Sequence, residues 1–170
     1  MKWLIVIVLL ALSGCRNFSI QNIDQPAPSA WKAWVKPGAT DLDIKKAMLE
    51  CGAPHPEVNG FIYGAVGIKD FDEQMNHFFL TGACMEKAGF VDRWRSVEQA
   101  CTDSNFPKRR DYPACQPGVA IPQRSVERRL NSWLCKLKTD REYCRKHAFT
   151  PSACDDPKKD YNDPPPECRP

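Results

Sequence analysis

The stretch KPGATDLDIKKAMLECG, residues 36–52, predicts the first helix of a small helical domain. A Pro-Gly turn precedes Thr40, which can cap the helix, and Asp43 three residues later completes a capping box. Gly52 is suited to the helix end, where a left-handed residue is common. The apolar residues between these two ends recur at helical spacing and share one face. They are Ile44, Ala47, Met48 and Cys51.

Three further segments have helical patterns. Residues 70–89 begin with Asp70 as a cap and carry aromatic and Met side chains at helical spacing, with Gly82 compatible with a close helix contact. Residues 125–138 place apolar side chains on one side and basic side chains mostly on the other. A shorter helix begins at Thr139 or Asp140 and carries Cys144. Residues 59–68, with three glycines, are either a hairpin strand or a loop.

The N-terminus has the features of a signal peptide. Lys2 precedes WLIVIVLLAL, residues 3–12, which contains no charge, Pro or Gly. A membrane-spanning helix needs about 17–25 apolar residues, so this run is too short to remain in the membrane as a span. We therefore interpret it as the apolar region of a signal peptide.

The four residues that follow this run are Leu12, Ser13, Gly14 and Cys15. They resemble, at every position, the lipobox of bacterial prolipoproteins. The resemblance implies diacylation of the Cys15 thiol, cleavage between Gly14 and Cys15, and acylation of the new amino group. Two or more acyl chains anchor a protein stably, whereas one holds it only marginally. The alternative is an ordinary signal peptide with an incidental cysteine.

The lipobox resemblance also implies a location and a partner. The protein would be lipid-anchored in the bacterial cell envelope, with the membrane as its partner through the lipid on Cys15. In well-studied lipoproteins of Gram-negative bacteria an aspartate after the cysteine retains the chain at the inner membrane. Arg16 occupies that position here, so the outer membrane is favoured if the host is Gram-negative. Envelope proteins and anionic glycan are further candidate partners.

The remaining chain has the length of one domain once residues 1–14 are removed. Residues 15–30 are polar, contain two prolines and have no periodicity, which predicts a flexible tether. Residues 31–150 form the helical domain, in which Trp31 and Trp34 cover the first helix. Residues 151–170 hold six prolines and form a tail that two cysteines are expected to tie down. The predicted fold class is mainly α, a small disulfide-stapled domain with irregular loops.

The number of cysteines is consistent with lipidation. Assignment of Cys15 to lipid leaves eight of the nine cysteines, and an exported chain tends to pair its thiols as disulfides. Metal binding is the weaker alternative, because there is no C-x-x-C pair and the histidines lack zinc-finger spacing. The eight cysteines are Cys51, Cys84, Cys101, Cys115, Cys135, Cys144, Cys154 and Cys168.

A second resemblance covers residues 34–90. A Trp-x-Lys-Pro-Gly-x-Thr helix that ends in Cys-Gly, followed by a helix with Cys-Met-Glu and a Gly-aromatic end, is similar to small, mostly uncharacterised bacterial envelope lipoproteins. It implies a Cys51–Cys84 bond between the two helices, and no activity. Eight cysteines allow 105 pairings, and an exchange among the last four would tie the tail to the helices. We predict bonds between neighbours for the rest, namely Cys101–Cys115, Cys135–Cys144 and Cys154–Cys168.

Known catalytic motifs do not occur in the sequence. The three histidines, His55, His77 and His147, are scattered, and there is no nucleophile elbow, phosphate loop or H-E-x-x-H pattern. We therefore predict a protein without catalytic activity, cofactor or metal. A small envelope enzyme remains an alternative, and it would require His77 or His147 beside buried carboxylates.

Charge is unevenly distributed. Residues 93–146 carry 13 Lys and Arg against six Asp and Glu. Arg128, Arg129 and Lys136 form a candidate face for anionic glycan, lipopolysaccharide or nucleic acid, provided that the face is exposed and contiguous. Nucleic acid is disfavoured because aromatic residues do not interleave with the basic ones. An ordinary solvated helix face is the simpler interpretation, so the leading prediction is a structural or interaction module.

Overall fold

A computed structural model describes residues 28–58, 64 and 66–170 of the chain. The described residues form mainly helices joined by irregular loops, so the predicted fold class is confirmed. The predicted signal peptide and most of the predicted tether lie outside the described residues. Most of residues 59–68, predicted to be a hairpin strand or a loop, also lies outside them.

Helix α2, Asp41–Cys51, has the predicted capping box. The hydroxyl of Thr40 accepts the backbone N–H of Asp43 at 3.2 Å, and the Asp43 carboxylate accepts the backbone N–H of Thr40 at 2.9 Å. These bonds satisfy donors that the first turn of a helix leaves free. Gly52 follows with φ of 105°, a left-handed conformation that side chains disfavour, and ends the helix.

Helix α3, Phe71–Lys87, also begins where the sequence predicts. The side chain of Asp70 accepts the backbone N–H of Glu73 at 2.9 Å and caps the helix. A disulfide joins Cys51 at the end of α2 to Cys84 near the end of α3. This bond, which the second resemblance implies, is confirmed, and it fixes the two longest helices against each other.

A short antiparallel pair of strands lies beside these helices. Strand β1, Trp34–Val35, pairs with β2, Val91–Asp92, with Trp34 opposite Asp92. The backbone N–H of Arg93 extends the pairing by donating to the carbonyl of Ala33 at 2.8 Å. Trp34 is buried and belongs to the core that α2 and α3 share, as expected of a residue that covers the first helix.

The domain begins with the 3-10 helix η1, Ala30–Ala33. Ala30 is buried in the same core as Trp34, so the packed domain includes the last residue of the predicted tether. Trp31 packs partly buried against this core, and its indole N–H donates to the Glu57 carboxylate at 2.9 Å. Both tryptophans therefore have structural roles.

Helix α4, Val97–Cys101, and the 3-10 helices η3, Pro107–Asp111, and η4, Pro113–Cys115, pack on the other side of α3. The Cys101–Cys115 bond closes this segment as predicted. Gly82 of α3 permits the close approach, because a β-carbon at this position would lie only 2.8 Å from Cγ2 of Val97.

The predicted helix over residues 125–138 is interrupted in the structure. Helix α5, Val126–Leu130, ends at Asn131, and α6, Trp133–Thr139, begins after Ser132. The Ser132 hydroxyl accepts the backbone N–H of Cys135 at 3.3 Å, so it caps a new helix instead of continuing the old one. Helix α7, Arg141–His147, follows Asp140, one of the two residues at which the sequence predicts it to begin, and Asp140 caps it.

The tail contains the 3-10 helices η5, Pro151–Asp155, and η6, Pro166–Cys168. The predicted bonds Cys135–Cys144 and Cys154–Cys168 are wrong. The structure has the exchanged pairs, Cys135–Cys168 and Cys144–Cys154. The tail packs on the helices through η5 against α7 and η6 against α6, which brings its cysteines to helix cysteines and away from each other.

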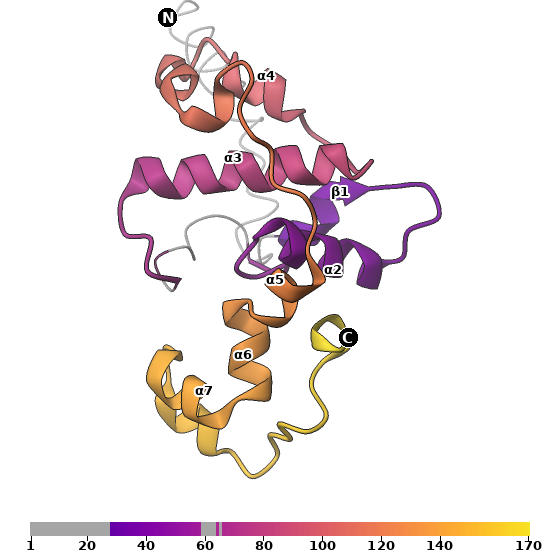
Figure 1. Ribbon diagram of the computed structural model, residues 1–170, viewed down its shortest axis with the longest axis vertical. Helices are drawn as coiled ribbons and strands as arrows, with labels where there is room; N and C mark the ends of the chain where they lie inside the picture. Colours follow the sequence, from indigo (N-terminus) through magenta and orange to yellow (C-terminus); the bar gives the residue numbers. More distant parts are fainter. Residues whose placement is uncertain (1–27, 59–63, 65) are drawn as a thin grey trace, which may run out of the picture.

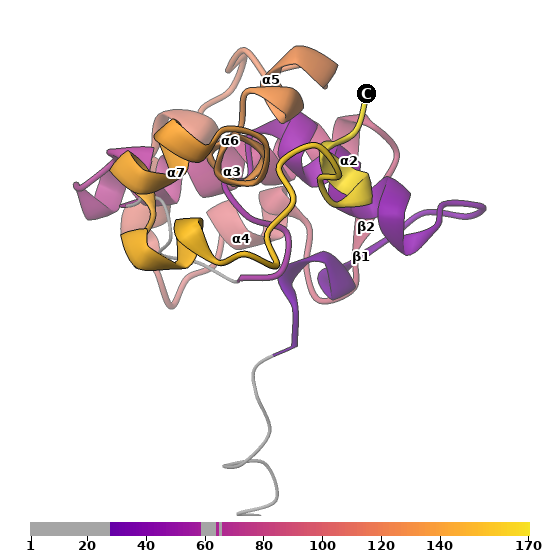
Figure 2. The ribbon, with the colours of Figure 1, turned by 90° about the horizontal axis from the view of Figure 1, so that it is seen from below.

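The arrangement of these elements is seen in two views. Figure 1 shows α3 crossing the molecule, with α4 on one side and α2 with β1 on the other, while α6 and α7 form one end. From α7 the tail turns back, and Figure 2 shows it passing beside α6 toward α2. Helix α2 therefore contacts both α3 and the C-terminal 3-10 helix η6.

Candidate functional site

The basic face predicted from Arg128, Arg129 and Lys136 is not formed. Arg129 is only 2% exposed, and its Nε donates to Oε1 of Glu50 at 3.1 Å. Arg128 donates to the backbone carbonyl of Glu50, and Lys136 lies over the ring of Tyr143 at 5.5 Å. A buried, paired guanidinium cannot meet a solvated anion, so the prediction of a contiguous anionic-ligand face is wrong.

Arg129 instead belongs to a structural network around Glu50. The second carboxylate oxygen of Glu50 accepts from Nε of Arg124 at 2.7 Å. Arg129 also donates from Nη1 to the backbone carbonyls of Glu167, at 2.7 Å, and Arg169. The network joins α2, α5 and the C-terminal segment, and its buried charges are paired and hydrogen-bonded as burial requires.

His55 and His147 make structural contacts. Nδ1 of His55 accepts the backbone N–H of Glu57 at 3.1 Å, and burial lowers the pKa of this imidazole. The ring of His147 stacks on Tyr143 with centroids 4.2 Å apart. Glu50 is the one buried carboxylate in the part of the chain that the structure describes, and its partners are arginines. The condition set for an enzyme, a histidine beside buried carboxylates, is not met at His147.

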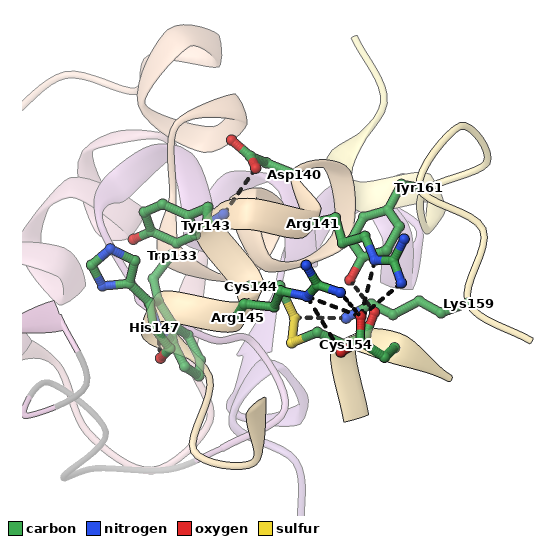
Figure 3. Close-up of a disulfide and its surroundings, with 11 residues drawn as sticks. Trp133, Asp140, Arg141, Tyr143, Cys144, Arg145, His147, Cys154, Lys159 and Tyr161 are labelled. Atoms are coloured by element: carbon green, nitrogen blue, oxygen red, sulfur yellow. Dashed lines mark hydrogen bonds and ion pairs between the residues drawn. A yellow bond between two sulfur atoms is a disulfide. The ribbon is translucent and has the colours of Figure 1, made fainter. Parts of the chain in front are cut away.

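Within the described ranges, no group of His, Cys, Asp and Glu side chains has the geometry to hold a metal ion. Arg141, Arg145 and Lys159 lie around the Cys144–Cys154 disulfide, as Figure 3 shows, and Nζ of Lys159 is 3.0 Å from Sγ of Cys144. Arg141 and Arg145 each donate to the Asp155 carboxylate at 2.7 Å. These contacts fasten the tail to α7.

A groove of about 400 Å³ with exposed aromatic residues lies between the β1–β2 pair, α3 and α4, and we call it the Trp94 groove. Trp94 is 66% exposed and Phe78 is 49% exposed, and both line the groove. Buried Trp34 also lines it, together with Arg95 and Arg109. The other lining residues are mostly apolar, namely Met75, Phe79, Gly82, Val97 and Ala100, with Asp92 and Ser96 as polar members.

The position of Trp94 is fixed by its own turn. The Asp92 carboxylate accepts the backbone N–H of Trp94 at 2.8 Å and that of Arg95 at 3.3 Å. Such a side chain-to-backbone turn holds an exposed residue without burying it. The sequence signal for this site is the triplet Arg93-Trp94-Arg95, and no apolar periodicity marks it as a site.

A smaller cavity of about 130 Å³ adjoins the Trp94 groove. Both recesses share Trp34, Phe78 and Trp94, and the smaller one is also lined by Ala30 and Ala33. The start of the described chain therefore lies at the edge of the same recessed surface.

No protein-family model, curated protein or solved structure matches this chain. In the described part of the chain, none of the helices combines the length and the apolar character needed to cross a bilayer. The residues of the Trp94 groove offer an apolar, aromatic surface together with the arginines Arg95 and Arg109.

Proposed function

We propose that this protein is a lipid-anchored lipoprotein of the bacterial envelope, attached through Cys15, and that it acts as a structural or interaction module without catalysis. The pairing of the other cysteines is the observation that carries the proposal. The four disulfides use all eight cysteines from Cys51 to Cys168, so none of these is left as a partner for Cys15. An unpaired thiol in a lipobox-like sequence is the group that acylation would use.

The disulfides also support export. Disulfides persist in oxidising compartments such as the bacterial periplasm and are rare in the reducing cytosol. All eight bonded cysteines lie in the domain that follows the predicted cleavage site. An envelope location accounts for both the paired cysteines and the apolar run at residues 3–12.

The module acts by presenting a surface. The interior is held by the Glu50 network and the disulfides, and Arg141 and Arg145 of α7 are engaged with Asp155 of the tail. Exposed apolar surface that a fold retains is often an interaction site. The Trp94 groove supplies such a surface.

The test is metabolic labelling of cells with an acyl-chain analogue. We expect the wild-type protein to carry the label and to sediment with membranes, and Cys15→Ala to lose both properties. The matched control is the double variant Cys135→Ala/Cys168→Ala, which removes two other cysteines and should keep the label. A wild-type protein that is cleaved, soluble and unlabelled would contradict the proposal.

Fractionation of a Gram-negative host tests the membrane. The chain with Arg16 is expected in the outer membrane fraction, and Arg16→Asp should move it toward the inner membrane. Arg16→Lys is the control, because it keeps the charge and should leave the location unchanged. Equal distribution of wild type and Arg16→Asp would remove the assignment to the outer membrane while leaving the anchor itself intact.

A further inference from the structure

We infer that the Trp94 groove is the face with which the domain rests on a lipid bilayer. Trp94 enters the headgroup region, and Arg93 and Arg95 contact anionic headgroups on either side of it. The inference rests on the proposed function, because the lipid on Cys15 would bring the domain to the bilayer. It goes beyond that function by naming the surface and its orientation.

The described chain joins the domain beside the Trp94 groove. Ala30 and Ala33 share with Trp94 the lining of the small cavity, and the backbone of Arg93 bonds to that of Ala33 at 2.8 Å. Figure 2 shows the start of the described chain leaving the body beside β1. Fourteen residues separate Cys15 from Ala30, and this length of chain reaches at most about 50 Å when extended. The membrane-tethered end and the exposed tryptophan therefore lie on the same part of the surface.

The exposed side chains of the groove, Trp94 and Phe78, suit a membrane interface. Tryptophan concentrates at membrane interfaces, because its ring is apolar and its indole N–H can remain hydrated. Trp94 is the most exposed tryptophan among the described residues, since Trp34 and Trp133 are buried and Trp31 is partly covered. Phe78 adds a second exposed ring within the same groove. Together they form an apolar surface whose contact with lipid removes it from water.

Trp94 has an arginine on each side of it in the sequence. Arg93 and Arg95 are both exposed, and such residues are attracted to anionic lipid surfaces. Arg95 is paired at 2.7 Å with Asp103, which is itself partly shielded by Arg109 at 3.9 Å. Two further carboxylates are hydrogen-bonded within the protein, since Asp92 accepts two backbone N–H groups and Glu86 accepts that of Val97 at 2.7 Å. Arg93, next to Trp94 in the sequence, is exposed.

A matched aromatic residue lies elsewhere on the protein. Phe149 is 74% exposed, and its ring packs edge-on against Trp133, 5.6 Å away. It follows α7, at the end of the molecule opposite α4 in Figure 1. Phe149 is therefore as apolar and as exposed as Trp94, but it does not adjoin the point where the chain joins the domain.

The first experiment measures binding of the full mature chain, with Cys15→Ser to prevent acylation, to vesicles of three parts zwitterionic and one part anionic phospholipid. We expect Trp94→Ala to weaken binding by roughly tenfold, as the loss of one large apolar contact implies. Arg93→Glu/Arg95→Glu should also weaken it and remove its dependence on anionic lipid and salt. The controls Phe149→Ala and Lys146→Glu should bind as the parent does.

The second experiment uses the acylated protein in vesicles that contain lipids brominated near the headgroup, which quench nearby tryptophan emission. Quenching should be strong in the wild type and largely lost in Trp94→Phe. Acrylamide, a quencher in the water phase, should reach Trp94 less well in vesicles than in detergent-free, unacylated protein. Wild-type emission that the brominated lipids do not quench would overturn the inference, as would vesicle binding that Trp94→Ala leaves unchanged.

The two proposals fail in different ways. Loss of acyl labelling at Cys15, with vesicle binding by the Cys15→Ser chain retained, would refute the anchor and keep the bilayer contact. An acylated protein whose Trp94 stays in water would keep the anchor and refute the contact. A groove that binds an envelope protein while Trp94 remains unquenched by lipid would likewise overturn the bilayer contact.

Discussion

The Nε atom of Arg129 lies 3.1 Å from Oε1 of Glu50, and both side chains are almost completely removed from water. Glu50 stands at the end of α2, between Leu49 and Cys51, which belong to two different hydrophobic clusters. Arg129 continues the connection to the C-terminal segment through the carbonyl of Glu167. One ion pair thus joins the core that α2 shares with α3 to the core formed by α6, α7 and the tail.

The first prediction concerns the two arginines that contact Glu50. Arg129→Ala leaves the buried carboxylate with only one partner and should lower the free energy of unfolding by about 3–5 kcal/mol. Arg124→Ala removes a partner that is 37% exposed and should cost at most about 1 kcal/mol. Denaturant unfolding of both variants measures the difference. Equal losses would show that burial does not set the strength of this network.

The second prediction concerns the C-terminal disulfides. Non-reducing peptide mapping should yield the Cys135–Cys168 and Cys144–Cys154 peptides, with no free thiol among the eight. The sequence separations are 33 and 10 residues, so the larger loop restricts the unfolded chain more. Replacing both cysteines of a pair by serine should cost about 3.7 kcal/mol for the first and about 2.7 kcal/mol for the second, on a chain-entropy estimate. A mapped Cys135–Cys144 peptide would contradict the structure.

The third prediction concerns the contact between α3 and α4. Gly82→Ala would place a β-carbon 2.8 Å from Val97, whose branched side chain has little freedom to move away. Overpacking of this kind costs about 1–3 kcal/mol, which exceeds the roughly 1 kcal/mol that alanine gains over glycine in a helix. We expect a lower melting temperature for Gly82→Ala. Stability should recover in Gly82→Ala/Val97→Ala, and a double variant no better than Gly82→Ala alone would argue against the contact.

The fourth prediction concerns pH. Hydrogen bonds from Arg145 and Arg141 hold the pKa of the Asp155 carboxyl below its ordinary value of 3.8. Because the folded pKa is the lower one, the contribution of Asp155 to stability is fully present above about pH 3.8 and is lost as pH falls through the folded pKa. Titration of the carboxyl ¹³C signal should show the pKa rise in Arg145→Gln.

Lys146→Gln serves as the control for this titration. It removes a neighbouring charge on α7 without touching Asp155, so it should leave the titration nearly unchanged. High salt should raise the pKa of Asp155 in the wild type, because the pair is exposed and screened. A salt-independent pKa would indicate that the arginine contacts are not made in solution.

The helices that the sequence predicts well are those whose start and end are marked by local chemistry. Thr40 with Asp43, Asp70 with Glu73, and Asp140 each act on backbone groups a few residues away, so their effect is visible in the sequence. Ser132 was overlooked because it lies inside an apolar pattern that continues across it. The cap and the pattern compete at that point, and the structure shows that the cap prevails.

Contacts between distant segments were predicted less well. The Cys101–Cys115 bond joins a short segment, and proximity in sequence is a fair guide there. The partners of Cys135 and Cys144 depend on where the tail folds back, and helical periodicity carries no information about that. The same limit applies to Arg129, which has the sequence pattern of a solvated helix face and is buried because Glu50 and the tail reach it.

The Trp94 groove also could not be predicted from the sequence. Trp94 stands alone between two arginines, with no apolar periodicity that would mark it as core or as surface. Its exposure follows from the pairing of β1 with β2 and from the turn at Asp92, which together place it at the edge of α3. Only the assembled structure brings it next to Ala30.

The Cys144–Cys154 bond lies inside the loop that Cys135–Cys168 closes, and this nesting bears on how the protein is made. A chain oxidised in the order in which its cysteines emerge would join Cys135 to Cys144 first, and that bond must later be broken by thiol–disulfide exchange. Within residues 51–115, by contrast, successive cysteines are the native partners. We therefore expect cells that lack a disulfide isomerase to accumulate protein with a native first half and a misbonded second half.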